Sequence, residues 1–542
     1  MKRFLKRLLC LALCAALCLS AAACSDKTDD ASEEGYANTL FDTGRVHTVN
    51  VVISEADWAD LRANPLEKTK YKVDVEIDGE TVEQVSFATK GNTSLSSVAG
   101  DPDSDRYSFK INFGKYVKGQ TYRGLNKLSL NNLYADATFM KDYLSYEIFR
   151  RAGVNAPLVS YVWLTVNGQD HGLYIAIEDM SESYLERTVQ GEGVLYKPET
   201  EQLANMAEPH DGQPGQGGPG QRPTLPEGGT PGESGQMPTP PEGGTPGESG
   251  QGGPGGQGGP GGQPGGQGGP GFGGSAKGAD LVYSDDETDS YTDIFDNNET
   301  KAEEADQKRV IAALKQLSEG GDYAACLDTE EVIRYFAAHN FVLNYDSYTG
   351  NMLHNYFLYE NDGRLSMLPW DYNLAFGAFA GGMGGGKDAT ALVNTGIDTP
   401  LSGASEQARP MWSWIVSDEQ WLGQYHAVYD ELLSSYFESG EFEKQIDKLY
   451  GLLKPYVEKD PSAFYTAEEY DAACQTLKQF CLLRSQSIRA QLSGSLSPRT
   501  DEQDQTARVD TGELQIDTMG SQGGPGGQGG PGWQPGGRGG AN

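Results

Sequence analysis

The stretch NYDSYTGNMLHNYFLYENDGRLSMLPWDYNLAFG, residues 344–377, decides the fold of this chain because polar residues stand at the ends of its apolar runs. Just before it, VIRYFAAHNFVLN (332–344) has the apolar spacing of a helix that ends before Asp346. Within it, NYFLY (355–359) and RLSMLPW (364–370) predict two short strands around an Asn-Asp-Gly turn. We therefore expect a helix, a loop and a hairpin in succession.

Three polar side chains in this stretch have the types and the order that phosphoryl transfer needs. Asp346 and Asn351 lie in the loop before the first strand, and Asp371 lies at the exit of the second. The interval between Asp346 and Asn351 equals that of a protein-kinase catalytic loop, where an Asp orients or deprotonates the acceptor hydroxyl and an Asn and a later Asp hold Mg²⁺. The same spacing also fits a capped turn between two buried elements. His354, in the same loop, fits phosphate binding or a hydrogen-bonded structural role.

The ordered series NYDSYTG, HNYFLY and PWDYNLAFG resembles the CotH family of spore-coat-type atypical protein kinases. Upstream segments resemble the same family: KGNTS (90–94), SFKINF (108–113), NGQDHGLYIAIED (167–179) and DLVYSDD (280–286). The resemblance implies a reduced protein-kinase fold, with ATP and Mg²⁺ as cofactors and with Ser, Thr or Tyr hydroxyls of a protein as acceptors.

Site roles follow from the resemblance, position by position. Asp346 would be the catalytic Asp, Asn351 a metal ligand and Asp371 the counterpart of the metal-binding Asp of the DFG motif. The chain departs from kinases in two respects: it has no G-x-G-x-x-G-x-V loop over the phosphates, and WDYN (370–373) replaces DFG. How the phosphates are covered is therefore not predicted.

The two halves of the chain differ in their patterns, which predicts an α+β fold of two lobes, and the resemblance implies that these lobes are kinase-like. Residues 45–211 have the pattern of a β-rich N-lobe, with hairpin signals at residues 78–79 and 167–168. Residues 276–496 are richer in helical apolar spacing and form the expected C-lobe.

Five further residues are candidates for contacts with the nucleotide. In a kinase, a strand Lys pairs with a helix Glu and reaches the phosphates, and Lys110 and Glu147 have this order. Ordinary surface charges are the alternative for this pair. Lys90 and Lys197 compete for the phosphate role, and the amides that follow Lys90 fit a small anion nest. Glu178 ends the last apolar strand, where a hinge between lobes would present backbone groups to adenine.

The amino end has the pattern of a targeting signal. Residues 1–23 contain a basic start, an apolar run and small residues, which together predict a secretory signal peptide. Cys24 follows directly and is a candidate for lipidation, with simple secretion as the alternative. The apolar run is too short to span a bilayer. Residues 24–44 are therefore expected to be a polar tether from a lipid anchor on the outer face of the cytoplasmic membrane.

The charge and the cysteines of the chain exclude several classes of function. The formal net charge of -35 argues against nucleic acid and anionic headgroups as partners. The spacing of Cys326, Cys474 and Cys481 favours apolar packing over a disulfide framework or a zinc site. The fold must therefore be held by its core.

Two segments rich in Gly, Pro and Gln interrupt the predicted fold: residues 212–275 and the tail 497–542. Both bury too little apolar area to offset their chain entropy, so we expect them to be disordered. The first segment falls between the predicted lobes. It fits a passive spacer, or an acceptor of phosphate because it carries several Ser and Thr residues.

Two functional hypotheses follow from these patterns. The first is an atypical protein kinase that transfers the γ-phosphate of ATP to a protein. The sequence does not identify this acceptor, and the chain's own insertion is one candidate. The second is a non-catalytic surface adhesin or pseudokinase, because a signal peptide places the chain where ATP is scarce. A measurement of ATP binding separates the two.

Overall fold

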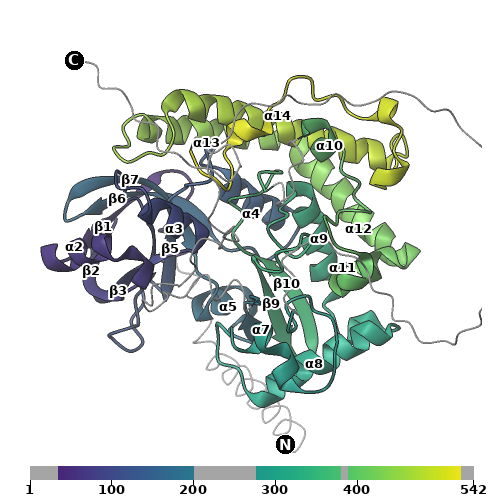
Figure 1. The fold of residues 1–542 in the computed structure, drawn as a ribbon, viewed down its shortest axis with the longest axis horizontal. Helices are drawn as coiled ribbons and strands as arrows, with labels where there is room; N and C mark the ends of the chain where they lie inside the picture. The colour runs from purple at the N-terminus through teal and green to yellow at the C-terminus, as the bar shows by residue number, and fades with distance from the viewer. Residues whose placement is uncertain (1–34, 201–275, 380–387, 526–542) are drawn as a thin grey trace, which may run out of the picture. The chain divides into compact units, whose positions relative to one another are not determined.

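A computed structural model describes residues 35–200, 276–379 and 388–525, which all belong to one compact unit (Figure 1). Strands and helices are both abundant, so the predicted α+β class is confirmed. The purple and blue strands make a closed barrel, and the teal, green and yellow segments are mainly helical (Figure 1).

Seven strands form the closed barrel: β1 (Val46–Val52), β2 (Tyr71–Ile77), β3 (Glu80–Lys90), β4 (Ser108–Asn112), β5 (Lys127–Asn131), β6 (Val159–Val166) and β7 (Gln169–Glu178). They neighbour one another in the order β1-β2-β3-β4-β5-β7-β6; β1 is parallel to β6, and the other pairs are antiparallel. Both predicted hairpins are present. Their turns hold Asp78-Gly79 and Asn167-Gly168 with positive φ at both positions, as a type I′ turn requires.

Four helices follow or connect the barrel strands: α2 (Glu55–Ala63), α3 (Thr93–Ala99), α4 (Lys141–Arg151) and α5 (Glu182–Val189). α2 begins after Ser54, whose Oγ accepts from the Asp57 N–H at 3.0 Å, as a helix cap does. α4 connects β5 with β6 and is buried over most of its length, including Asp142 and Tyr146. It therefore belongs to the core and can place polar groups there.

The helical part contains α7 (Thr292–Phe295), α8 (Glu304–Glu319), α9 (Thr329–Val342), α10 (Ala389–Val393), α11 (Pro410–Val416), α12 (Glu419–Leu432), α13 (Glu441–Val457) and α14 (Ala467–Leu492). It also contains a sheet of order β10-β9-β8, made by β8 (Val194–Tyr196), β9 (Tyr356–Asn361) and β10 (Arg364–Pro369). α9 and the β9–β10 hairpin confirm the predicted helix, loop and hairpin. β8 pairs with β9, so residues 194–196 join the helical part and not the N-lobe predicted for residues 45–211.

Residues 35–44, expected to be part of the polar tether, are folded against the barrel. Tyr36, Leu40 and Phe41 are buried in the barrel core. Tyr36 Oη also donates to Glu178 Oε1 at 2.6 Å. The tether prediction is wrong for these residues, because three large apolar side chains bury enough area to order a short segment.

Residues 497–525, expected to be part of a disordered tail, are ordered as well. They form short 3₁₀ helices at Thr500–Glu502, Gln505–Ala507 and Ile516–Met519. Ile516 and Met519 are buried in the main core, and the Met519 carbonyl accepts from the Ala137 N–H at 3.2 Å. The prediction of disorder is wrong for these residues, because the composition of a whole segment hides a few apolar residues that pack against the core.

Several predictions fall on residues outside the described ranges. The signal peptide (1–23), Cys24, the insertion (212–275) and the end of the tail (526–542) are among them, and they stay predictions. Within the described ranges, no helix is long and apolar enough to cross a membrane. The three described cysteines are buried and free, in agreement with their predicted role in apolar packing.

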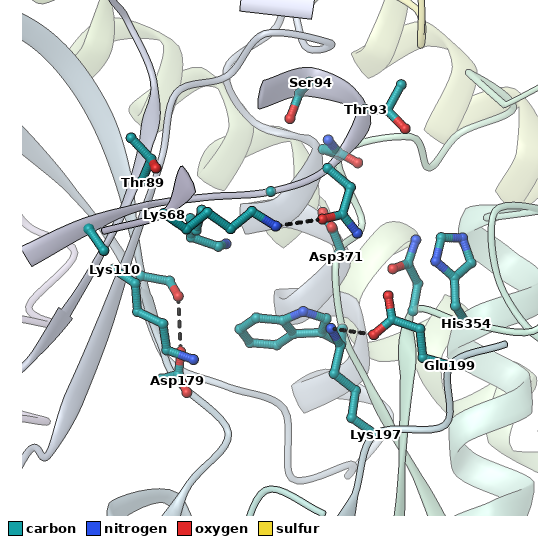
Figure 2. Close-up of a pocket in the computed structure, with 18 of the residues that line it drawn as sticks. Lys68, Thr89, Thr93, Ser94, Lys110, Asp179, Lys197, Glu199, His354 and Asp371 are labelled. Atoms are coloured by element: carbon teal, nitrogen blue, oxygen red, sulfur yellow. Dashed lines mark hydrogen bonds and ion pairs between the residues drawn. The ribbon is translucent and has the colours of Figure 1, made fainter. Parts of the chain in front are cut away.

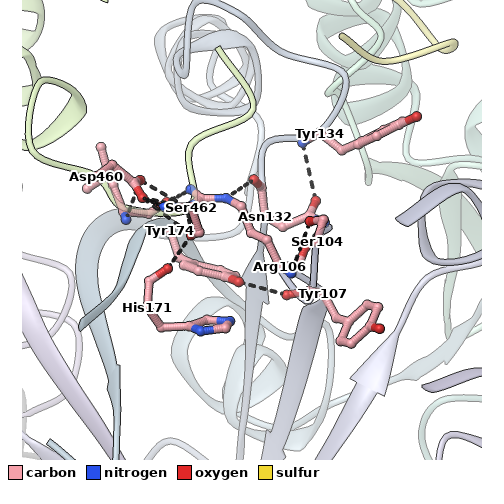
Figure 3. A network of polar contacts seen from close by, with 10 residues as sticks. Ser104, Arg106, Tyr107, Asn132, Tyr134, His171, Tyr174, Asp460 and Ser462 are labelled. Atoms are coloured by element: carbon pink, nitrogen blue, oxygen red, sulfur yellow. Dashed lines mark hydrogen bonds and ion pairs between the residues drawn. The ribbon is translucent and has the colours of Figure 1, made fainter. Parts of the chain in front are cut away.

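A buried ion pair fastens the barrel to the connection between α13 and α14 (Figure 3). Arg106 Nη1 lies 2.9 Å from Asp460 Oδ2, and both side chains are fully buried. Asp460 also accepts from the Leu173 N–H at 2.8 Å, and Arg106 Nε donates to the Asn132 carbonyl at 3.1 Å. Gly172 is required beside the pair, because a Cβ there would collide with both members. The full set of partners offsets the cost of burying two charges.

Candidate active site

A cavity of about 690 Å³ lies between the outer face of the barrel and the 344–377 segment. Figure 2 shows Lys110 and Asp179 on the barrel side of the cavity, and His354 and Asp371 on the side of the helical part. The volume is in the range of cofactor and ligand sites. Two walls of different chemistry therefore face each other.

The barrel wall is made by alternate residues of three neighbouring strands. The register places Ala88 of β3 beside Lys110 of β4, and Lys110 beside Ser129 of β5. A second row of the same register consists of Ser86, Asn112 and Lys127. Successive side chains of a strand point to opposite faces, so these residues point away from the barrel core. The barrel wall of the cavity therefore consists of small side chains and of lysines that project from the sheet.

Lys110 is held by an acidic partner other than the predicted one. Its Nζ lies 3.0 Å from Oδ2 of Asp179, the residue directly after β7. Glu147, the predicted partner, forms ion pairs with Arg150 and Arg151 on its own helix and lies outside the cavity lining. The predicted Lys110–Glu147 pair is therefore wrong, because sequence order does not show which side of α4 meets the barrel.

The pKa values of this wall show how its charges balance. Burial alone would lower the pKa of Lys110, but Asp179 and then Glu299 outweigh it, so the pKa is raised. Burial alone would raise the pKa of Asp179, but Lys110 and Lys127 outweigh it, so the pKa is lowered. Both groups are therefore charged at neutral pH.

Glu178 serves the fold and not the cavity. Its side chain is fully buried, with Oε2 2.6 Å from Arg187 Nη2. Side-chain alternation at the end of β7 turns Glu178 away from the cavity and Asp179 into it. The side chain of Glu178 therefore lies outside the cavity, whereas the predicted contact of backbone groups with adenine stays a prediction.

Lys90 and Lys197 both line the cavity, and their contacts with phosphate stay a prediction. Lys90 Nζ donates to Asn131 Oδ1 at 2.6 Å and lies 5.7 Å from the centre of the Trp370 ring. Burial lowers the pKa of Lys90, although the neighbouring carboxylates of Asp371 and Asp179 act to raise it. Lys197 Nζ lies 3.6 Å from Glu199 Oε2. A desolvated ammonium such as that of Lys90 interacts strongly with an incoming anion.

On the opposite wall, two side chains fix the Asp346 carboxylate. His354 Nε2 lies 2.8 Å from Asp346 Oδ1, and Nε2 carries the proton in this contact because a carboxylate only accepts. Asn355 Nδ2 donates to Asp346 Oδ2 at 3.1 Å and to the Asp346 carbonyl at 2.8 Å. All three residues line the cavity.

Asn351 does not reach this cluster. Its side chain is exposed, lies outside the cavity lining and packs against Gly403. Asn355, four residues later, occupies the place beside Asp346 that was predicted for Asn351. The structure therefore does not bring Asn351 to the cavity, because a shared interval in sequence does not ensure a shared loop conformation.

Asp371 is positioned by α4 and by the end of α9. Its φ of 57° lies in the left-handed region, which few residues other than glycine adopt. The Asp371 N–H donates to Tyr146 Oη at 3.0 Å, and the Tyr372 N–H donates to Asp142 Oδ1 at 2.8 Å. Asn344 Nδ2 donates to the Asp371 carbonyl at 3.3 Å. These contacts hold an unusual backbone conformation that turns Asp371 into the cavity.

The cavity is positive within a strongly negative chain. Its lining holds seven lysines and five carboxylates, whereas the whole chain has 42 basic and 77 acidic residues. A concave surface with a net positive charge attracts anionic ligands. A polyphosphate is the ligand chemistry that fits this lining.

The wall opposite the lysines offers ligands for a hard cation. Among the described residues, no group of three or more His, Cys, Asp or Glu side chains gathers in a way that would hold a metal ion. Mg²⁺ usually keeps several waters and binds through one or two carboxylates together with substrate phosphates. Asp346, Asn355 and Asp371 supply such a set. The donors fit Mg²⁺ that binds together with a nucleotide.

Several cavity residues were given no role by the sequence analysis, and Asn355 and Lys127 are two of them. Asn355 stands in the motif HNYFLY, which was interpreted as a strand and as part of the family resemblance. Asp179 follows Glu178 in the predicted hinge, so the segment was found but the side chain that faces the cavity was not. Lys127 gives no signal in the sequence, because only the β4–β5 register brings it to the cavity.

Comparison with known proteins gives this architecture a family. The family described as CotH kinase protein matches residues 87–225 and 266–488, more than half of the chain. The chain belongs to the CotH kinase protein family. The gap in the CotH match, residues 226–265, lies inside the Gly/Pro-rich insertion, so the insertion interrupts the family domain.

Two curated proteins of Bacillus subtilis strain 168 are similar to the chain. Inner spore coat protein H is 20% identical over 398 residues, which cover 72% of this chain and 84% of that protein. Inner spore coat protein H-like protein is 34% identical over 76 residues, which cover 14% of this chain and 23% of that protein. The resemblance to the CotH family found in the sequence is confirmed.

Proposed function

We propose that this CotH family protein is a Mg²⁺-dependent protein kinase that transfers the γ-phosphoryl group of ATP to a Ser, Thr or Tyr hydroxyl of a protein. The observation that carries the proposal is the cavity, in which the lysines of the barrel face Asp346, Asn355 and Asp371. Phosphoryl transfer needs little covalent chemistry from a protein, so positioning and charge neutralisation suffice. In this proposal the barrel is the N-lobe of a kinase and the helical part is its C-lobe.

The barrel wall neutralises the phosphates. Lys110 is kept charged by Asp179, and Lys127 stands in the neighbouring row. Lys90 adds a desolvated ammonium close to Asp371. Lysine acts on phosphate as a point charge, so these three tolerate small differences in the path of the phosphate chain.

The opposite wall positions the acceptor. Asp346 orients the acceptor hydroxyl and takes its proton while the acceptor oxygen bonds to the γ-phosphorus and the bond to the bridging oxygen of ADP breaks. Asp371 and Asn355 would hold Mg²⁺, which would supply neutralisation of the charge on the transferred group. The contacts of Asp346 with His354 and Asn355 keep its carboxylate in place.

Phosphate incorporation from labelled ATP tests the proposal. Asp346→Ala and Asp371→Ala should each lower incorporation by about 10²-fold or more, because they remove the base and a metal ligand. Asp501→Ala, at a side chain that is 73% exposed, is the matched control and should be as active as the wild type. Full activity of either cavity variant, with an unchanged melting temperature, would contradict the assignment.

A second candidate function is a non-catalytic surface protein, favoured by the similarity to Inner spore coat protein H. In that case the cavity is a binding site without turnover, or is no nucleotide site at all. Calorimetry with ATP and Mg²⁺ separates the candidates. Micromolar binding together with phosphate incorporation supports the kinase, whereas binding without incorporation, or undetectable binding, supports the surface protein.

The location of the protein is part of the proposal. We infer from the signal pattern that Cys24 is lipidated and that the mature chain lies outside the cytoplasm, on the outer face of the cell membrane. Cys24→Ser should then release the protein from the membrane fraction. A wild-type protein that is found in solution with an unmodified amino terminus would contradict the anchor.

A further inference from the structure

A positive patch borders the cavity on the barrel side, and we call it the basic rim. It consists of Lys70, just before β2, of Lys72, near the start of β2, and of Lys115, Tyr116 and Val117, in the turn after β4; all five are exposed. Tyr116 joins the two segments. Its Oη donates to the Lys70 carbonyl at 2.8 Å, and Lys72 Nζ lies 5.3 Å from the centre of its ring.

The lysines of the basic rim differ from those on the helical part in their lack of acidic partners. The described residues give Lys70, Lys72 and Lys115 no carboxylate within ion-pair distance. On the helical part, ion pairs join Lys308 to Glu304, Lys315 to Asp286, and Lys444 to Glu441. In a chain with 77 acidic and 42 basic residues, three neighbouring lysines without acidic partners form a local positive field.

The basic rim also carries apolar area. Tyr116 is 39% and Val117 is 37% exposed, and they are two of the four large apolar side chains that the described part leaves exposed. An exposed aromatic ring among lysines offers a contact that a small inorganic anion cannot use, because such an anion has no apolar surface. Exposed tyrosines are enriched at surfaces that bind polypeptides, and the neighbouring lysines add a preference for acidic chains.

The basic rim continues into the cavity. Lys70 and Lys115 also line the cavity. Lys72 stands in one cross-strand row with Ser86, Asn112 and Lys127. Neighbouring strands lie about 4.8 Å apart, so this row spans roughly 14 Å, the length of about four extended residues. A polypeptide that leaves the cavity along the row therefore meets the basic rim within a few residues.

We propose that the basic rim binds an acidic segment of the acceptor polypeptide, a few residues away from the hydroxyl that receives the phosphate. The term acceptor rests on the proposed kinase function, but the binding itself requires no ATP. Lysines on flexible stems attract carboxylates along an extended chain without demanding one geometry, and like charge repels basic chains. A bilayer fits less well, because the row of lysines runs into a concave cavity that a flat surface does not enter.

Fluorescence anisotropy with the full chain, without ATP and at low salt, tests the inference. The probes are three labelled peptides that differ only in the residues around one Ser: Glu, Gln or Lys. The Glu peptide should bind and weaken with added salt, because exposed charges are screened. Binding should fall at least about tenfold in the double variant Lys70→Glu/Lys115→Glu, since two attractions become repulsions.

The matched control is the double variant Lys301→Glu/Lys308→Glu, which makes the same change in net charge at side chains that are 85% and 65% exposed. It should bind the Glu peptide like the wild type. An equal loss in this control, or equal binding of the Glu and Gln peptides, would overturn the inference.

Sedimentation with phosphatidylglycerol vesicles covers the competing partner. Vesicle binding that depends on Lys70 and Lys115, without binding of the Glu peptide, would assign the basic rim to a membrane and overturn the inference. No arm of the experiment uses ATP. A failure here therefore leaves the kinase proposal untouched, and a failure of ATP binding in calorimetry leaves the peptide result untouched.

Discussion

Lys110 Nζ lies 3.0 Å from Asp179 Oδ2 at the edge of the cavity. The carboxylate comes from the residue after β7, a strand that is two positions away from β4 in the barrel order. Backbone hydrogen bonds of the barrel therefore set the distance between the two groups. No helix takes direct part in this pair. In protein kinases, by contrast, the Glu that pairs with the Lys comes from a helix that can move.

Replacing Lys110 should weaken ATP binding. Lys110→Met removes an ammonium that is held charged in the cavity, and we expect the Kd for Mg-ATP to rise by roughly thirtyfold, about 2 kcal/mol. Calorimetry measures the change, and Lys301→Met, at an exposed side chain, is the control that should bind normally. Lys110→Met also leaves the buried Asp179 carboxylate without its ion-pair partner and should lower the free energy of unfolding. Adding Asp179→Asn should restore that stability but not the affinity for Mg-ATP. Unchanged affinity in Lys110→Met would remove this lysine from the site.

The hydroxyl of Tyr146 should control the response to Mg²⁺. Tyr146→Phe removes the acceptor of the Asp371 N–H and frees a backbone in an unusual conformation. We expect the Mg²⁺ concentration for half-maximal phosphate transfer to rise about tenfold, as is typical when a group behind a metal ligand is lost. Tyr143→Phe, the same change on the same helix at a ring that stacks on Tyr161, is the control. Equal Mg²⁺ requirements in both variants would show that Tyr146 does not position Asp371.

The buried Arg106–Asp460 pair should dominate the coupling between the barrel and the helical part. Asp460→Asn leaves the Arg106 charge buried without its counter-charge, and we expect the free energy of unfolding to fall by about 3–5 kcal/mol. Asp447→Asn breaks the exposed pair with Lys478 and should cost less than about 1 kcal/mol. Urea unfolding of both variants measures the difference. Similar losses for the two variants would contradict the role of the buried pair.

Stability should fall between weakly acidic and neutral pH because of Glu331. Burial raises the pKa of Glu331 to about 7, above its ordinary value of 4.5. The folded state therefore binds this proton more tightly than the unfolded chain does. The free energy of unfolding should decrease as the pH rises from 4.5 to about 7, by up to about 3 kcal/mol, and then level off.

Glu331→Gln isolates this effect, because the amide oxygen can still accept from the Asn155 N–H. The variant should lose the decrease and be more stable than the wild type at pH 8. Urea unfolding at several pH values checks the result. The same pH dependence in both proteins would show that Glu331 is not the group responsible.

Local signals in the sequence were sufficient for the hairpins and for the helix before Asp346. Asp78-Gly79 and Asn167-Gly168 mark their turns because few other pairs adopt positive φ at both positions. The parallel pairing of β1 with β6 has no local signal, since it joins segments more than a hundred residues apart. Closure of the barrel was therefore not predictable from patterns of this kind.

The sequence predicted which segments form the candidate site better than it predicted which residues of those segments face the cavity. Asp346, Asp371, Lys90, Lys110 and Lys197 meet in one cavity. Glu147, Glu178 and Asn351 lie outside it, because the face of a helix or strand end, and the path of a loop, are decided by packing that the sequence does not display. Asp179 follows Glu178 directly, and Asn355 lies four residues after Asn351; both line the cavity.

The central claim is that this cavity binds ATP with a divalent metal between Asp371 and Asn355 and places the γ-phosphate near Asp346. A crystal structure with a non-hydrolysable ATP analogue and Mn²⁺, read from the anomalous signal of manganese, tests it most directly. We expect a manganese peak within ligand distance of Asp371 and of the phosphates, with Lys110 on the phosphate chain. An analogue bound elsewhere, or a cavity that stays without metal at saturating Mn²⁺ and nucleotide, would contradict the claim.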